Sequence, residues 1–194
     1  MLPSSRARLL ELVRTRAFSF GDFTLASGKK STYYINSKKI LFHSESVALI
    51  GEAFAEQMRD LDIQAVGGLE LGAIPLATAC VLQAHREGRS LEGFVVRKQA
   101  KGHGSQERIE GVLPAGARVA IVDDVLTTGG SALQALEEVS RAGAVVVAVL
   151  CIVDRLEGAR EVFEPRCAYR PLFTIRDFGV EPPGGVRCTS GFRA

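Results

Sequence analysis

Two adjacent carboxylates, Asp123 and Asp124, end an apolar run and precede a turn of small residues, Thr127–Ser131. Glycines let a backbone approach an anion closely, and successive N–H groups with hydroxyls can surround a phosphate. The helix-forming segment 132–139 would point its positive end at the same anion. Because two carboxylates repel a bare phosphate, they need another partner, which ribose hydroxyls or hydrated Mg²⁺ would supply. The pattern therefore predicts a site for a phosphorylated sugar.

Alternative interpretations of this segment are an ordinary turn, a Walker A loop and a dinucleotide fingerprint. It could be an ordinary turn between a strand and a helix, with the acids serving as helix caps. It is not a Walker A loop, because no Gly-Lys-Ser or Gly-Lys-Thr follows the glycines. It is not a dinucleotide fingerprint either, because Gly-x-Gly-x-x-Gly is absent after the apolar run.

A second group of reactive types lies in the polar segment 98–111, which we expect to lack regular structure. Gly102 and Gly104 flank Lys101 and His103 there, and Arg97 and Lys98 precede them. The charges alone would suit a solvated surface loop. Long structureless loops in compact domains are often functional, and cations on flexible joints suit a lid that closes over a pyrophosphate leaving group.

Three segments resemble known motifs. Residues 118–131 resemble the phosphoribosyl pyrophosphate (PRPP) motif of type I phosphoribosyltransferases, with a hydrophobic strand, Asp-Asp and Thr-Thr-Gly-Gly-Ser in order. Residues 97–104 resemble the Arg-Lys-x-x-Lys-x-His-Gly catalytic loop of the orotate-using members. Residues 23–31, followed by Tyr33 and Tyr34, resemble their N-terminal substrate-binding element. The segments follow the family's order and span most of the chain.

The resemblance implies transfer of phosphoribose from PRPP to orotate, giving orotidine 5′-phosphate and pyrophosphate in UMP biosynthesis, with Mg²⁺ as cofactor. The catalytic residues it implies are Lys101, His103, Arg97, Asp123 and Asp124. The PRPP-binding residues it implies are Arg97, Lys98, Lys101, His103, Asp123, Asp124, Val125, Leu126, Thr127, Thr128, Gly129, Gly130 and Ser131. The metal is expected mainly on the substrate, with Asp123 or Asp124 contacting it through water.

The resemblance also implies contacts to orotate and to pyrophosphate. Thr127, Arg155 and Tyr34 would bind orotate, with Arg155 presenting a planar fork to its carboxylate. The loop that follows the strand at 65–69 would bind pyrophosphate through Glu70, Leu71, Gly72 and Ala73. The chain departs from the family at Ala26, where some members carry lysine, and in the residues after Arg155.

Two rival functions share the PRPP site. One is a phosphoribosyltransferase for another base, which the catalytic-loop pattern and Arg155 disfavour. The other is a regulator that senses PRPP without catalysis, and retention of Lys101 and His103 disfavours it. The family further implies a homodimer in which each lid reaches the neighbouring subunit's site.

The elements that would position these residues follow from periodicity. Helical spacing predicts helices at 4–16 and 44–59, and short extended pieces near 23–25 and 33–36 predict a hairpin. From residue 65 onwards strands and helices alternate, with strands at 65–69, 93–97, 118–122 and 145–153 and helices at 73–86 and 131–142. Such alternation predicts an α/β fold with a central parallel sheet flanked by helices and ligands at the carboxyl ends of the strands. By resemblance this is the type I phosphoribosyltransferase fold, with a small N-terminal hood. We expect one domain over 1–194, with the helix and hood in about 1–43 and the core in about 44–180.

Composition favours a soluble cytoplasmic protein. The chain has 194 residues, 46% hydrophobic and 24% charged, with a net charge of +2. That charge is too small to argue for a nucleic-acid or membrane partner, and no apolar run reaches the roughly 20 residues of a membrane span. The four cysteines have no metal-binding spacing, and Cys80 and Cys151 lie in apolar runs as expected for buried free thiols.

Overall fold

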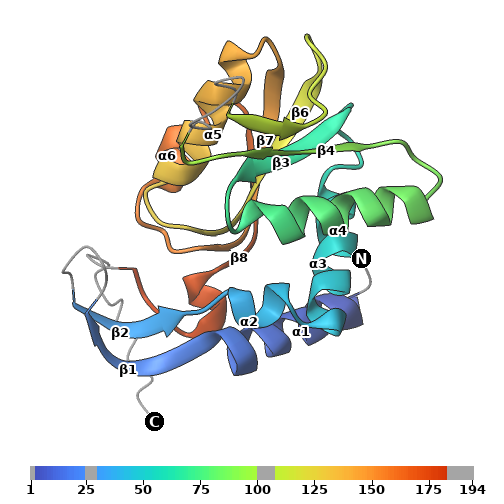
Figure 1. The fold of residues 1–194 in the computed structure, drawn as a ribbon. Coiled ribbons are helices and arrows are strands. Elements are labelled where there is room, and N and C mark those ends of the chain that lie inside the picture. The colour runs from blue at the N-terminus through green and yellow to red at the C-terminus, as the bar shows by residue number, and fades with distance from the viewer. Residues whose placement is uncertain (1–2, 25–29, 100–107, 183–194) are drawn as a thin grey trace.

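The N-terminal part of the chain forms a small hood beside a larger sheet (Figure 1). The computed structural model describes residues 3–24, 30–99 and 108–182. The hood elements are α1 (Pro3–Leu12), the π-helical turn η1 (Val13–Ala17), the antiparallel strands β1 (Phe18–Thr24) and β2 (Lys30–Ile35), and the short helix α2 (Lys38–Leu41). The predicted N-terminal helix and hairpin are confirmed, with the hairpin strands longer than expected.

The core is a six-stranded sheet in the order β5-β4-β3-β6-β7-β8 within the described part of the chain. Its strands are β3 (Ala65–Leu69), β4 (Glu92–Val96), β5 (Ile109–Gly111), β6 (Arg118–Leu126), β7 (Val145–Asp154) and β8 (Ala168–Thr174). All neighbours run parallel except β5, which pairs antiparallel with β4. The expected α/β fold is therefore confirmed, with a mixed rather than wholly parallel sheet.

Helices cover both faces of the sheet (Figure 1). They are α3 (Ser44–Gln57), α4 (Ala73–Arg86), α5 (Gly130–Arg141) and α6 (Ala159–Phe163), and the 3-10 turn η2 (Ile175–Phe178) follows β8. Strand β6 explains the two layers, because Ala120 and Val122 pack with α3 and α4 whereas Val119 and Ile121 pack with α5 and α6. Side chains alternate between the faces of a strand, so a continuous apolar run fills both cores.

Three sheet features differ from the prediction. The expected structureless segment 98–111 ends in strand β5, which is too short to show a period. Strand β8 was not predicted, since Arg170 and Pro171 interrupt its apolar pattern. Its place at the sheet edge explains this, because an edge strand tolerates proline. Strand β6 continues to Leu126, four residues beyond the predicted end, and so includes both aspartates.

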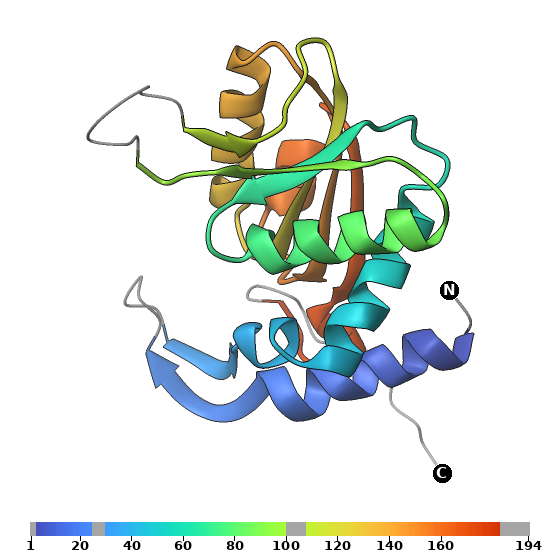
Figure 2. The same ribbon diagram turned by 45° about the vertical axis from the view of Figure 1, so that its right-hand side comes forward.

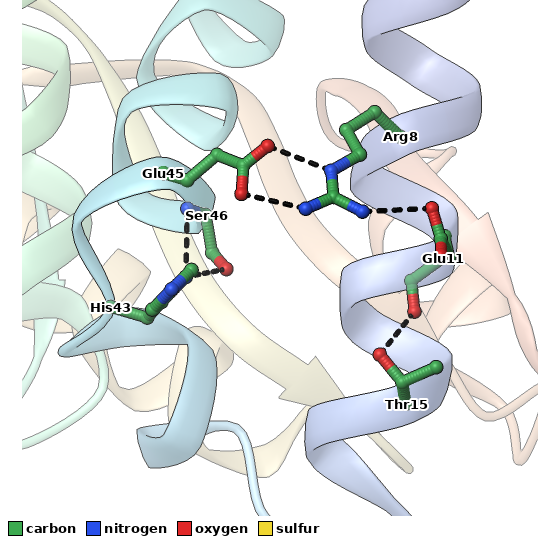
Figure 3. Close-up of polar contacts among 6 residues, drawn as sticks. All are labelled: Arg8, Glu11, Thr15, His43, Glu45 and Ser46. Carbon is green, nitrogen blue, oxygen red and sulfur yellow. Dashed lines mark hydrogen bonds and ion pairs between the residues drawn. The ribbon is translucent and has the colours of Figure 1, made fainter.

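The hood lies below the sheet in Figure 2, and its buried side chains belong to the same apolar core as those of the sheet and its helices. Leu9 and Val13 are fully buried, and the rings of Phe18 and Phe178 stack with centroids 4.2 Å apart. Polar contacts add to this on the surface, where the Arg8 guanidinium donates two hydrogen bonds to Glu45 of α3 (Figure 3). Because exposed ion pairs contribute little stability, the apolar contacts hold the hood in place.

Candidate active site

The two aspartates lie side by side near the carboxyl end of β6 and are almost buried, each with 8% of its surface exposed. The Asp124 N–H donates to Asp123 Oδ1 at 2.8 Å, and the Val125 N–H donates to Asp124 Oδ1 at 2.9 Å. These backbone hydrogen bonds fix both carboxyl groups relative to the strand. Both carboxyls therefore lie near the edge where parallel sheets bind ligands.

Two hood residues contact the second aspartate. The Lys38 ammonium lies 2.6 Å from Asp124 Oδ2, and the Ser37 hydroxyl donates a short hydrogen bond to the same oxygen. Ser37 is 4% exposed, whereas the Lys38 side chain is 45% exposed. The hood thus reaches into the acidic site, a contact that the sequence analysis did not predict.

These surroundings shift the pKa values of the two carboxyl groups in opposite directions. Burial, together with the neighbouring Asp124 charge, raises the pKa of Asp123 from 3.8 to about 7. Burial would also raise the pKa of Asp124, but hydrogen bonds from Lys38 and Ser37 and the Lys38 charge outweigh it and lower that pKa. One group is thus a firm carboxylate, and the other can hold a proton near neutral pH. A pair of this kind can both accept hydrogen bonds from hydroxyls and donate one.

The turn after β6 leads directly into the first turn of helix α5. Thr127 is half-buried, Thr128 is exposed, and helix α5 begins at Gly130, so the N–H groups of its first turn have no helical partner. Gly129 has a φ of +84°, and a Cβ there would lie 2.7 Å from the Phe163 ring. Glycine is therefore required at that position by backbone angle and by space.

A second loop faces the aspartates from the neighbouring strand. Glu70, Leu71 and Gly72 connect β3 to α4, and a Cβ on Gly72 would lie 2.8 Å from Asp124 Cγ. The Glu70 N–H donates to the Val96 carbonyl, and its carboxylate accepts the Lys98 N–H at 2.8 Å. The predicted pyrophosphate loop thus contacts both the acidic pair and the start of the predicted lid.

The start of the predicted lid is held by Arg108. Its guanidinium donates to the carbonyls of Arg97 and Lys98 and to Glu138 of α5. The Arg97 side chain lies 3.4 Å from Glu110, and Lys98 is exposed. Lys101 and His103 lie outside the described residues, as does Ala26.

At the end of the next strand, Arg155 stands between the hood and the sheet. Its Nε donates to the Tyr33 hydroxyl at 2.9 Å and lies 2.8 Å from Glu157 Oε1. The guanidinium carbon also sits 4.8 Å from the Tyr33 ring centre. Within the described residues no hydrogen bond engages the two terminal nitrogens, so the fork is available to a ligand carboxylate.

Tyr33, which precedes the predicted orotate-binding residue Tyr34, contacts Arg155. Tyr33 is 5% exposed, and burial raises its pKa, so its hydroxyl keeps its proton. Tyr34 points to the other face of β2, is 46% exposed and packs against Phe23. Strand alternation implies that only one of two adjacent tyrosines faces inward, but it does not say which one.

The structure therefore gathers most of the predicted residues at one edge of the sheet. Those it brings there are Glu70, Leu71, Gly72, Ala73, Arg97, Lys98, Asp123, Asp124, Val125, Leu126, Thr127, Thr128, Gly129, Gly130, Ser131 and Arg155. Leu126 itself is 1% exposed and half-buried Val125 packs on the core, so these two can offer a ligand little beyond their backbone. Residues that the sequence analysis missed are Tyr33, Ser37, Lys38 and Glu157.

Comparison with known proteins identifies the family. Residues 36–170 match the model of the phosphoribosyl transferase domain. Orotate phosphoribosyltransferase of Rhodopseudomonas palustris (strain TIE-1) is 44% identical over 180 residues, which cover 90% of this chain and 96% of that protein. The chain belongs to the orotate phosphoribosyltransferase family.

Further relatives agree with this membership. The orotate phosphoribosyltransferase of Rhodopirellula baltica is 42% identical over 91% of this chain and 95% of its own. The Mycobacterium tuberculosis orotate phosphoribosyltransferase, solved in complex with PRPP, is 40% identical with a TM-score of 0.77, over 91% of this chain and 99% of that one. The type I phosphoribosyltransferase resemblance and fold inferred from the motifs are thus confirmed.

The described residues contain no group of three or more His, Cys, Asp or Glu side chains that could hold a metal ion. Nor do they contain a helix long and apolar enough to span a membrane.

Proposed function

We propose that this protein transfers the phosphoribosyl group of PRPP to orotate, giving orotidine 5′-phosphate and pyrophosphate, the penultimate step of UMP biosynthesis. The observation that carries this proposal is the position of Arg155. Its open fork lies one residue beyond β7, while the acidic pair and the anion-binding turn lie at the end of adjacent β6. A carboxylate-bearing base held there would lie beside a sugar held by the PRPP motif.

Each part of the site then has one role toward PRPP. Asp123 and Asp124 hold the ribose hydroxyls, and the turn 127–131 with the start of α5 binds the 5-phosphate. The loop 70–73 binds pyrophosphate through backbone N–H groups, while Arg97 and Lys98 supply charge next to it. Lys101 and His103 would add cations over the departing pyrophosphate.

The reaction itself needs no covalent nucleophile. The bond from the anomeric carbon to pyrophosphate breaks as the orotate nitrogen forms its bond to that carbon, with an oxocarbenium-like transition state akin to glycoside cleavage. The protein contributes by placing the two substrates, stabilising charge on pyrophosphate and excluding water that would hydrolyse PRPP.

Mg²⁺ is the proposed cofactor. When bound, it would neutralise charge on pyrophosphate. The donor set fits an ion held mainly by substrate oxygens, since the two carboxyls are adjacent and one of them is firmly ionised. Asp123 or Asp124 would reach it through water.

Product formation with different bases tests the function. The purified protein is incubated with PRPP and Mg²⁺, together with orotate, adenine, xanthine or no base, and pyrophosphate release is followed. We expect release with orotate alone. Release with adenine or xanthine instead would indicate another base-specific phosphoribosyltransferase. PRPP binding without turnover would indicate a PRPP-sensing regulator.

We further propose a cytoplasmic homodimer in which each lid closes on the partner's site. A groove of about 450 Å³ between α3 and α4 supports this, because large apolar side chains line it and are exposed. These are Phe42, Leu71, Ile74 and Leu82. Exposed apolar patches often mark protein interfaces. Leu71 also belongs to the pyrophosphate loop, so a partner seated on this groove would adjoin the site.

Two measurements test the dimer. Leu82→Glu should shift the molecular mass measured by sedimentation towards that of the monomer. Val145→Glu, an equally exposed control at the first residue of β7, should not. Mixing inactive Lys101→Ala with inactive Asp124→Asn subunits should restore activity, since a mixed dimer pairs one intact lid with one intact PRPP site. Failure of complementation in a stable dimer would mean that each subunit closes its own site.

A further inference from the structure

The hood contributes a cation to the acidic site that neither the PRPP motif nor the predicted lid contains. Lys38 is the first residue of α2, and its ammonium lies 2.6 Å from Asp124 Oδ2. Among the described residues, Lys38 alone forms an ion pair with either aspartate of the motif. It is 86 residues distant in sequence from its partner.

The backbone around Lys38 is fixed by packing. The next turn of α2 buries Ile40 and Leu41, which are 1% and 2% exposed. Just before it, the Asn36 N–H donates to the Ala17 carbonyl at 2.8 Å, and buried Ser37 shares the same Asp124 oxygen. A well-packed part of the hood therefore holds the ammonium next to Asp124, although the Lys38 side chain is 45% exposed.

The position has an electrostatic consequence for the substrate. PRPP carries several negative charges, and two nearly buried carboxyls in its ribose site would repel it. A cation within hydrogen-bond distance of Asp124 offsets that repulsion and also holds the carboxylate in one rotamer. The Gly72 backbone also lies close to this carboxylate, since a Cβ added there would lie 2.8 Å from Asp124 Cγ.

We propose that Lys38 is a positioning residue for PRPP, acting through Asp124 by orienting its carboxylate toward the ribose hydroxyls and compensating its charge. This inference rests on the proposed function. It differs from a purely structural role, in which the Lys38–Asp124 pair would only fasten the hood to the sheet.

The test compares three variants at neighbouring positions. Lys38→Met removes the cation, Lys38→Arg retains it, and Lys39→Met removes an equal charge from the next residue, which is exposed and makes no side-chain ion pair within the described residues. We expect Lys38→Met to raise the KM for PRPP by about tenfold to a hundredfold, the range for a lost hydrogen bond to a charged group. The turnover number and the KM for orotate should change much less, Lys38→Arg should recover part of the loss, and Lys39→Met should match the wild type.

A double-variant cycle shows whether Lys38 acts through its partner. PRPP binding is measured by calorimetry for Lys38→Met, Asp124→Asn and the double variant. If the two residues act as a unit, the double variant binds no more weakly than Asp124→Asn alone. Fully additive losses would overturn the positioning role.

Other outcomes would contradict either the inference or the proposed function. Equal KM values for Lys38→Met and Lys39→Met would overturn the inference, as would a lower Tm with unchanged kinetics. If the wild type neither binds PRPP nor releases pyrophosphate with orotate, the proposed function fails instead, and that result is distinct because it appears before any variant is made.

Discussion

Replacing Arg155 with alanine tests the orotate site most directly. The side chain is only 11% exposed and uses Nε for Tyr33 and Glu157, which leaves its two terminal nitrogens for a ligand. Removing the guanidinium therefore deletes the proposed partner of the orotate carboxylate. It also leaves Glu157, 17% exposed in its side chain, without its cation.

The expected magnitude follows from the cost of breaking such a pair. Truncating one partner of a buried, hydrogen-bonded charge pair costs roughly 2–5 kcal/mol. At about 1.4 kcal/mol per factor of ten, the KM for orotate should rise by about thirtyfold to several thousandfold. Arg155→Lys should recover only part of the loss, because an ammonium cannot supply the planar fork.

Part of that loss could come from repulsion by the unpaired Glu157. The double variant Arg155→Ala/Glu157→Gln removes this charge and separates the two effects. If the lost contact dominates, the double variant should stay close to Arg155→Ala. Full recovery in the double variant would instead assign the effect to Glu157.

The assay is steady-state pyrophosphate release with each substrate varied in turn. We expect the KM for PRPP to stay near its wild-type value while the KM for orotate rises, because the acidic pair and the anion-binding turn are left intact. A matched rise in both KM values would refute the reasoning, since it would mean that Arg155 supports the fold of the whole site.

Three other predictions concern the PRPP site. Gly72→Ala should raise the KM for PRPP in the same assay, since the new Cβ would lie 2.8 Å from Asp124 Cγ and push the carboxylate away from Lys38. The far-ultraviolet circular dichroism spectrum should not change. An unchanged KM would contradict this prediction. Without substrates, the wild type should lose stability relative to Asp123→Asn as pH rises from about 4 to about 7. The reason is that Asp123 in the folded state holds its proton up to a pKa of about 7, whereas the unfolded chain releases it near 3.8. Parallel curves of Tm against pH for the two proteins would disprove this. Lys101→Ala should lower kcat by about 10²–10³-fold, the cost of one charge-stabilising donor, and an unchanged kcat would remove Lys101 from catalysis.

The residues that identify the site are contiguous, and sequence alone was sufficient to find them. An apolar run ending in Asp123-Asp124 and a glycine turn before a helix former specify strand, turn and helix through local backbone preferences. The alternation of such units then predicts where the strands end relative to one another. Arg155 could be placed at the same edge as the aspartates for this reason, before any contact was known.

Other features depended on contacts that local pattern does not encode. Strand β5 is three residues long and β8 contains Pro171, so pairing with neighbouring strands, rather than periodicity, defines both. The choice between Tyr33 and Tyr34 depended on how the hairpin packs against the sheet.

Only the tertiary structure connected the hood to the two substrate sites. Lys38 meets Asp124 across 86 residues, and Tyr33 meets Arg155 across 122. Lysine and tyrosine at those positions suit an exposed helix end and a strand as well as they suit a binding site. Their contacts arise because burial of Ile40, Leu41 and Phe18 docks the hood against the carboxyl edge of the sheet, and that docking brings a cation and a phenol to groups already positioned there.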